Sequence, residues 1–148
     1  MNLNQLKKYL KGWFNESPFL NTVVVSSKND FNDLRNVNYP VCHIEYISSS
    51  TNPNFKNYVF NITIADIQNN KIKSKNVEDI HNDTSLIAQD FIDFHSENIE
   101  LFELDENIQI NTFEEENPDR TAGVTFAVRI PIFREKNICI IPKKGESN

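Results

Sequence analysis

The stretch that decides the fold is residues 55–67, with the sequence FKNYVFNITIADI. Large apolar side chains alternate there with smaller or more polar ones, so that one face carries Tyr58, Phe60, Ile62 and Ile64 and the other carries Val59, Asn61, Thr63 and Ala65. Because successive side chains of a strand point to opposite faces, this period of two predicts a half-buried strand. The turn-rich run SSSTNPN at 48–54 precedes it, which predicts that the strand is the second arm of a hairpin.

The residues before the turn supply the first arm of that hairpin. Asn38-Tyr39-Pro40 leads into residues 41–49, and proline is acceptable at the start of a strand but not in its paired interior. Three consecutive valines at 23–25 predict an earlier short strand over 22–27. The polar residues 28–38 between these two strands are expected to form a loop.

Helical spacing follows the hairpin. Side chains suited to a buried face recur every three or four residues at Val77, Ile80, Thr84, Ile87, Phe91 and Phe94 or His95. This spacing predicts a long amphipathic helix that covers the sheet, with Ser74 or Asn76 as its N-cap. The same spacing at Leu3, Leu6, Leu10 and Trp13 predicts a shorter N-terminal helix that ends near Ser17-Pro18.

Alternation with a period of two returns after the long helix. Ile108 and Ile110 open a strand, and an acidic turn at 114–119 separates it from a second arm. That arm alternates Val124, Phe126, Val128, Ile130 and Ile132 with Thr125, Ala127, Arg129 and Pro131. The second set is half polar, so this face is expected to meet solvent or a partner. A last short strand is predicted at 138–141.

Together these patterns predict a single α+β domain over residues 1–142. Its sheet is expected to be mainly antiparallel, with the N-terminal helix and the long amphipathic helix packed on one face. Residues 143–148 lack apolar anchors and are expected to form a flexible tail. One core is predicted from the inward-facing residues, which are Tyr58, Phe60, Ile62, Ile64, Val77, Ile80, Ile87, Phe91, Val124, Phe126, Val128 and Ile130.

Composition excludes several classes of protein. The 148 residues carry a formal net charge of -6, which disfavours direct DNA binding because phosphate backbones are bound mainly by Lys and Arg. No apolar run reaches half of the roughly 20 residues that a membrane-spanning helix requires. The first residues lack the apolar stretch of a secretory signal, so we expect the protein to begin in the cytoplasm. Cys42 and Cys139 are therefore expected to be ordinary buried thiols rather than a disulfide.

The sequence predicts no catalytic residue, metal or cofactor. Three glycines cannot build a phosphate-binding loop, and Gly123 is instead expected to permit a bulge or a close backbone approach. His81 and His95 would lie roughly 21 Å apart along the long helix. Cys42 and His43 would point to opposite faces of a strand. The acidic turn lacks the ligand order of a calcium loop, and no G-x-S-x-G motif is present.

Three stretches resemble the tail terminator and neck proteins of tailed bacteriophages. Residues 38–44, NYPVCHI, resemble the proline-led start of that family's first long hairpin, and residues 119–126, DRTAGVTF, resemble the start of its late strand. The long helix at 77–98, followed by Phe102 and alternating strands, occupies the family's middle position. The resemblance covers about residues 3–142.

This resemblance implies a small non-enzymatic virion structural subunit that is assembled in the host cytoplasm. Such a subunit forms a homo-oligomeric ring at the head-tail neck or at the tail-tube end, where it joins or caps the passage for DNA. Its partners would be other neck, portal or tail-tube proteins. The resemblance implies no sequence-specific nucleic-acid binding, no membrane contact and no cofactor.

Two other functions stay open on the sequence alone. A free-standing cytoplasmic enzyme of similar fold would hold its active site in a cleft that periodicity does not reveal. A host-factor-binding adaptor would use the same exposed hairpin without forming a ring.

The subunit interface is predicted on the long helix and on the second hairpin. Leu86 lies about 140° around the helix from the buried stripe, so it is expected to face outward. Asp83 and Asp90 would form a polar rim around this single apolar contact, although one exposed leucine is also ordinary. The opposing surface is predicted to be either the hairpin tip at 48–57 or the strand face of Thr125, Ala127 and Arg129.

Overall fold

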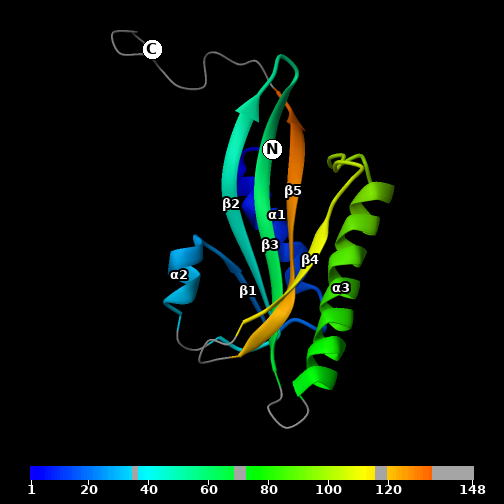
Figure 1. Ribbon diagram of the computed structural model, residues 1–148. Coiled ribbons are helices and arrows are strands. Elements are labelled where there is room, and N and C mark those ends of the chain that lie inside the picture. The colour runs from blue at the N-terminus through cyan, green and yellow to red at the C-terminus, as the bar shows by residue number, and fades with distance from the viewer. Residues whose placement is uncertain (35–36, 69–72, 116–119, 135–148) are drawn as a thin grey trace.

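The computed structural model describes residues 1–34, 37–68, 73–115 and 120–134 (Figure 1). Its elements are α1 (Leu3–Asn15), β1 (Thr22–Val25), α2 (Lys28–Asn32), β2 (Val41–Thr51), β3 (Phe55–Ile67), α3 (Lys73–Glu97), β4 (Ile110–Glu114) and β5 (Thr121–Phe133). The strands form one sheet with the order β1-β2-β3-β5-β4. β1 runs parallel to β2, and the other three neighbouring pairs are antiparallel. The predicted α+β class with a mainly antiparallel sheet is confirmed.

The centre of the sheet is the pair β3 and β5. Phe55 lies opposite Phe133, and the register continues without a break through all 13 residues of each strand. The two backbones come close at Gly123, where a Cβ atom would lie 2.9 Å from Cα of Ala65. The expected close backbone approach at this glycine is confirmed.

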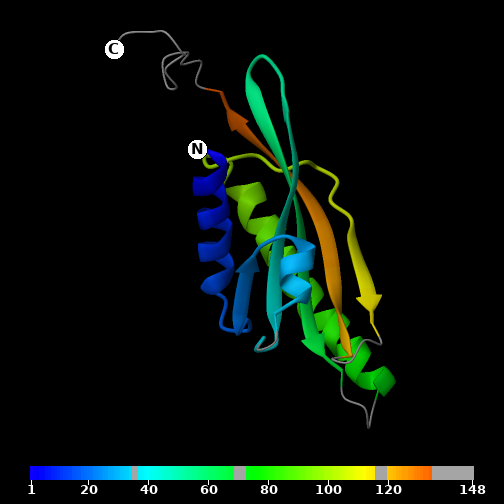
Figure 2. The ribbon, with the colours of Figure 1, turned by 90° about the vertical axis from the view of Figure 1, so that its left-hand side faces the viewer.

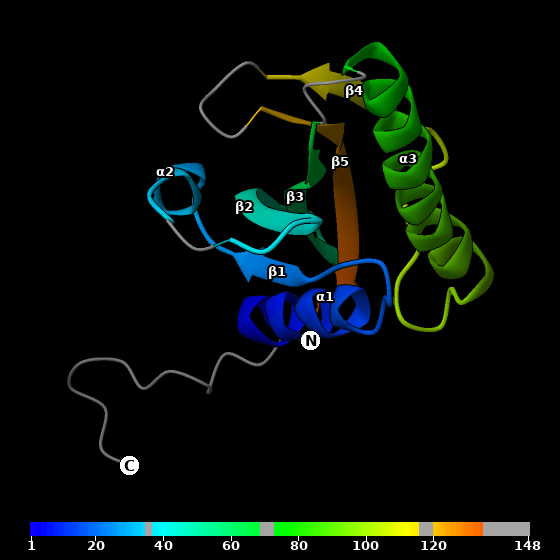
Figure 3. The ribbon, with the colours of Figure 1, turned by 90° about the horizontal axis from the view of Figure 1, so that it is seen from below.

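α1 and α3 cover one face of the sheet and bury its large apolar side chains (Figure 3). All of the residues predicted for the core are buried. Most of them form one cluster with α1, but Val77 and Ile80 pack with Ala122 in a small separate cluster. The prediction of one continuous core is wrong at this point, because these residues lie at the start of α3 and of β5, beyond the main cluster.

α1 matches the predicted N-terminal helix in extent but not in its whole buried face. The Asn2 side chain accepts a hydrogen bond from N of Gln5, and the Gln5 side chain accepts one from N of Asn2, each at 2.8 Å. Phe14 is fully buried, whereas Trp13 is only partly buried. The Phe14 ring stacks on Phe91 of α3, with ring centroids 5.1 Å apart, and the Trp13 ring contacts Phe91 edge to face at 5.2 Å.

A helix also lies on the other face of the sheet, where a loop was expected. α2 is capped by Ser27, whose side chain accepts a hydrogen bond from N of Asp30. The Phe31 ring stacks on His43 with ring centroids 4.3 Å apart. His43 pairs with Thr63, so both belong to the face opposite α1 and α3 (Figure 3).

Two predicted boundaries are wrong, and two predictions fall outside the described residues. α3 begins at Lys73, so Ser74 and Asn76 lie inside the helix rather than at its N-cap. β4 begins at Ile110, so Ile108 precedes the strand, and the pairing with β5 runs from Ile110 opposite Phe126 to Glu114 opposite Ala122. The predicted strand at 138–141 and the predicted tail at 143–148 lie outside the described residues.

Candidate functional site

The first half of the predicted interface is an exposed ridge on α3. Leu86 is 58% exposed, and Asp83 and Asp90 are exposed on either side of it. The outward orientation predicted for Leu86 is confirmed. No Lys or Arg occurs between residues 76 and 97, so this acidic ridge presents one leucine within a field of carboxylates.

The second half is the outer sheet face, formed by β3 and β5 on the side away from α1 and α3. Thr125 is partly buried there, and Ala127 is exposed. The Thr125 hydroxyl donates to Oδ1 of Asn61 at 3.2 Å, and it lies 3.2 Å from the Thr63 hydroxyl. The hydroxyl of Thr63 therefore donates to that of Thr125, which links the two strands through a short polar chain.

Arg129 extends this outer sheet face toward the edge of the sheet. Its guanidinium lies 2.9 Å from a carboxylate oxygen of Asp105, and both side chains are about half exposed. Exposed ion pairs of this kind contribute about 0–1 kcal/mol to stability. The pair orients Arg129 without burying its charge, so the positive charge stays accessible at the end of the outer sheet face.

The two predicted surfaces do not meet within one molecule. α3 packs on the face of the sheet that carries Phe126 and Val128, whereas Thr125, Ala127 and Arg129 point to the other side. Figure 3 shows α3 and α2 on opposite sides of the strands. The domain therefore carries two unlike surfaces that face away from each other.

The alternative contact surface, the tip of the β2–β3 hairpin, extends beyond the helices (Figure 2). In the described part of the chain, β1 pairs with the first four residues of β2, and the outer side of residues 45–51 has no neighbouring strand, whereas their other side pairs with β3. A register shift between Tyr46 and Ser48 interrupts this edge, and Ile47 at the shift is 51% exposed. Bulges of this kind hinder pairing with other chains at an open edge.

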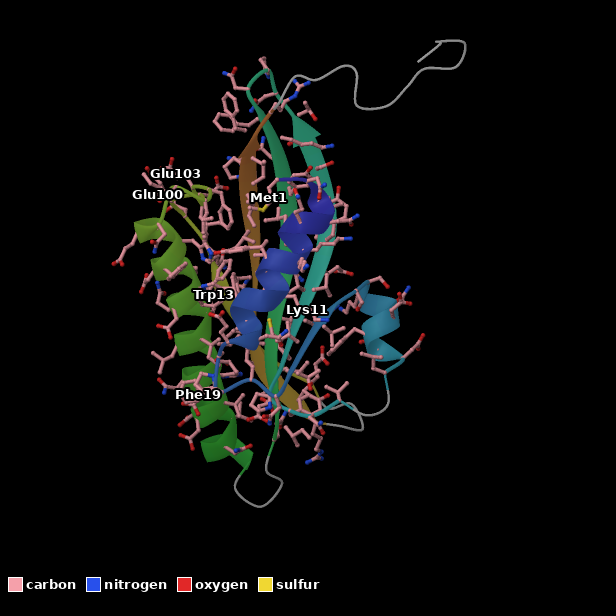
Figure 4. The ribbon with its side chains drawn as sticks, turned by 180° about the vertical axis from the view of Figure 1, so that it is seen from behind. Met1, Lys11, Trp13, Phe19, Glu100 and Glu103 are labelled. Carbon is pink, nitrogen blue, oxygen red and sulfur yellow. The ribbon has the colours of Figure 1, made fainter. Side chains whose placement is uncertain are left out.

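A groove that the sequence patterns did not indicate lies beside the end of β5. It has a volume of about 530 Å³ and is lined by Phe55, Pro131, Phe133 and residues 99–106. Glu100 and Glu103 lie close together at this end of the molecule, past the last turn of α3 (Figure 4). The only sequence signal is the mixture of apolar and acidic residues in IELFEL at 99–104, where the two glutamates are three positions apart and so do not follow the period of a strand.

Each of the three histidines of the chain forms a hydrogen bond from a ring nitrogen to a backbone carbonyl oxygen. His43 Nε2 lies 3.0 Å from the carbonyl oxygen of Ser26, His81 Nε2 lies 2.8 Å from that of Phe113, and His95 Nδ1 lies 2.7 Å from that of Phe91. A carbonyl oxygen only accepts, so each of these nitrogens carries the proton.

The neighbouring Ser26 and His43 do not form a nucleophile and base. The Ser26 hydroxyl donates to the carbonyl oxygen of Ser27 at 2.9 Å. Nε2 of His43 lies 3.3 Å from that hydroxyl, but it already carries a proton and cannot accept a second. Burial lowers the pKa of His43 below its ordinary value of 6.5.

Metal-binding groups are separated in the described part of the chain. No three His, Cys, Asp or Glu side chains gather there as a set able to hold a metal ion. Cys42 is fully buried, and burial raises the pKa of its thiol far above the ordinary value. Cys42 and His43 pair with Ile64 and Thr63 of β3, respectively, so they point to opposite faces of the sheet as predicted.

No protein-family model matches this chain, and no curated protein sequence shows significant similarity to it. Among the described residues, none of the helices is both long enough and apolar enough to cross a membrane.

Proposed function

We propose that this chain is a non-enzymatic structural subunit that assembles head-to-tail into a ring at the neck or tail-tube end of a tailed bacteriophage. The observation that carries the proposal is the placement of the acidic ridge and the outer sheet face on opposite sides of one small domain. A head-to-tail contact joins two different patches, and it closes into a ring when the rotation between subunits permits.

The chemistry of the two surfaces suits such a contact. Leu86 supplies one apolar anchor, and truncation of a central anchor of this type often dominates binding energetics. The outer sheet face offers the small side chain of Ala127 beside the accessible guanidinium of Arg129. Arg129 complements the carboxylates of Asp83 and Asp90, and such complementarity orients subunits as they meet.

Charge also fits the proposed DNA passage. The chain carries a net charge of -6. A negative surface repels the phosphate backbone, so DNA would pass through the ring without adhering to it. The subunit would then join or cap the passage together with other neck, portal or tail-tube proteins.

The bonding of the histidines favours this function over an enzyme. Each imidazole is engaged with a backbone carbonyl, and the Ser26–His43 pair has the wrong proton arrangement for nucleophilic catalysis. Among the described residues, the lining of the groove beside β5 consists of apolar and carboxylate side chains, without a Ser, Cys or His. This lining offers no nucleophile paired with an imidazole base.

The test is the mass of the purified chain in solution, combined with negative-stain images. We expect a closed ring for the wild-type chain and a folded monomer, or a smaller assembly, for Leu86→Asp, because the interface would bury an unpaired charge. Leu34→Asp is the matched control for the acidic ridge, since Leu34 is 47% exposed and follows α2, which lies on the opposite side of the sheet from α3 (Figure 3). A monomeric wild-type chain at all concentrations would contradict the proposed function. A ring unaffected by Leu86→Asp would show that Leu86 is merely exposed, and it would contradict the placement of the contact on the acidic ridge.

A further inference from the structure

We propose that residues 136–144, which follow β5, dock in the groove beside β5 of their own chain. The apolar residues 138–141 would lie against the apolar wall of the groove, and the flanking lysines would face its carboxylates. This inference does not depend on the ring, because it concerns contacts within one chain.

The groove has the character of a binding surface that needs a cover. Four of its large apolar side chains are exposed: Phe55 (39%), Ile99 (59%), Leu101 (43%) and Phe133 (70%). Apolar surface gathered in this way usually marks an interaction site, whereas single exposed residues do not. The groove is also acidic, because its lining includes Glu100, Glu103, Asp105 and Glu106 but no Lys or Arg.

The segment after β5 has the complementary composition. Residues 136–144 read KNICIIPKK, which is an apolar run of four flanked by Lys136, Lys143 and Lys144. The other parts of the chain outside the described residues are 35–36, 69–72 and 116–119, and they contain one aliphatic residue, Ile72. Among these segments, therefore, 136–144 alone matches both the apolar wall and the negative charge.

The last described residues before this segment lie beside the groove. Phe133 lines the groove, and the next residue, Arg134, is held at the hairpin tip. Its backbone N donates to the carbonyl oxygen of Asn54 at 2.8 Å, and its Nη1 donates to that of Asn52 at 2.9 Å.

The connection is long enough for the segment to turn back into the groove. The four residues from Arg134 to Ile138 span up to about 13 Å. Attachment to the same chain also gives the segment an effective concentration of about millimolar. This favours its own groove over that of a neighbouring molecule.

Disulfide trapping in the full-length chain tests this contact. Cys139 lies in the middle of the apolar run, and the other cysteine, Cys42, is fully buried and does not compete. Leu101→Cys and Ile99→Cys place a second thiol in the groove, and Leu86→Cys places one on the acidic ridge as the matched control. Alternate residues of an extended segment point to opposite sides, so the thiol of Cys139 could face away from the groove. The three cysteine variants are therefore also made in a chain that carries Cys139→Ser and Ile140→Cys, which moves the thiol to the other side of the segment.

We expect mild oxidation to form an intrachain disulfide with at least one groove position. Its yield should exceed that of the Leu86→Cys control by about fivefold or more, and dilution should not lower it, because the partners share one chain. Yields equal to the control at both groove positions would overturn the proposal. Interchain disulfides that disappear on dilution would also overturn it, since they would assign the groove to a neighbouring molecule. Neither result alters the mass measurement that tests the ring.

The reactivity of Cys139 provides a second readout without an added thiol. Leu101→Asp should weaken the docking of the apolar run and raise the alkylation rate of Cys139 severalfold, whereas Leu34→Asp, at an exposed site outside the groove, should leave the rate unchanged. Alkylation of the buried Cys42 reports unfolding in the same experiment. If Leu101→Asp exposes Cys42, the variant has unfolded, and Ile99→Asn is used in its place. An unchanged Cys139 rate in folded groove variants would overturn the proposal.

Discussion

The hydroxyl oxygen of Tyr9 in α1 lies 2.8 Å from Nε2 of His95 in α3. His95 is fully buried, and its Nδ1 donates to the carbonyl oxygen of Phe91. Nε2 of the neutral ring therefore accepts, and the Tyr9 hydroxyl donates. The imidazole also stacks on Phe102 with ring centroids 5.0 Å apart. One neutral histidine thus joins both helices that cover the sheet to the loop that follows α3.

This arrangement predicts that mild acid destabilises the fold. Burial lowers the pKa of His95, and also that of His43, below the ordinary value of 6.5. The unfolded chain then binds protons more readily than the folded one. The two histidines therefore contribute their full stabilisation above about pH 6.5, and this contribution is lost as the pH falls through their lowered pKa values in the folded protein. The decline is at most about 1.4 kcal/mol per pH unit for each histidine.

Urea unfolding between pH 7.5 and 5.5 measures this dependence above the range in which most carboxylates titrate. His95→Gln should lower the stability at neutral pH and reduce the slope, because one of the two titrating groups is removed. A wild-type slope of zero over this range would contradict the assignment of His95 as a neutral buried group.

Phe91→Ala should strongly destabilise the domain. Phe91 is fully buried and its ring contacts Phe14, Trp13 and Phe126. Removal of a buried phenylalanine ring typically costs about 3–5 kcal/mol. The control is Phe19→Ala, at a site that is 69% exposed, and it should change the free energy of unfolding by less than about 0.5 kcal/mol. Equal unfolding midpoints for the two variants would refute this placement of Phe91.

Two glycine substitutions should change stability in opposite directions. Gly123→Ala introduces a Cβ atom against the β3 backbone, so the strands must separate, at a cost of about 1–3 kcal/mol. Gly12→Ala meets nothing within 4 Å inside α1, and it should stabilise the domain by about 0.5–1 kcal/mol through helix propensity. The midpoints of thermal unfolding of both variants test this prediction. A Gly123→Ala variant as stable as the wild-type chain would refute the close approach of the two strands.

The purified protein should carry no stoichiometric zinc, calcium or nucleotide. His81 and His95 bond to different backbone carbonyls on α3 and β4, and Cys42 and His43 point to opposite sides of β2. Elemental analysis and the absorbance ratio at 260 and 280 nm provide the measurement. One equivalent of a metal per chain would overturn this prediction.

The parts of the fold that the sequence predicts are those with a regular period. β3, β5 and α3 are long, so their apolar residues repeat often enough to define a face, and Phe60, Phe91 and Phe126 are buried as expected. α2 is different because it has five residues and a single large apolar one, Phe31. Its position depends on the ring of His43, which lies 12 residues later in the sequence.

The candidate site also has one part that the sequence predicts and other parts that it does not. The exposure of Leu86 follows from its angle on α3 alone, since a helix fixes that angle within a few turns. The ion pair between Arg129 and Asp105 depends on the path of an irregular loop after α3, and no period in the sequence describes that path. The groove was missed for the same reason, because Phe55, Leu101 and Phe133 come from three distant parts of the chain.

The uninterrupted register of β3 with β5 gives the molecule a direction of mechanical strength. A force applied along these strands loads the ladder of hydrogen bonds in shear, so many bonds must break together, whereas a force across the sheet opens them pair by pair. β1 pairs through four residues and β4 through five, so the two edges would peel first. Resistance to such forces depends on the rate of unfolding rather than on equilibrium stability. The domain should therefore be stiff along the hairpin axis and compliant at both edges of the sheet.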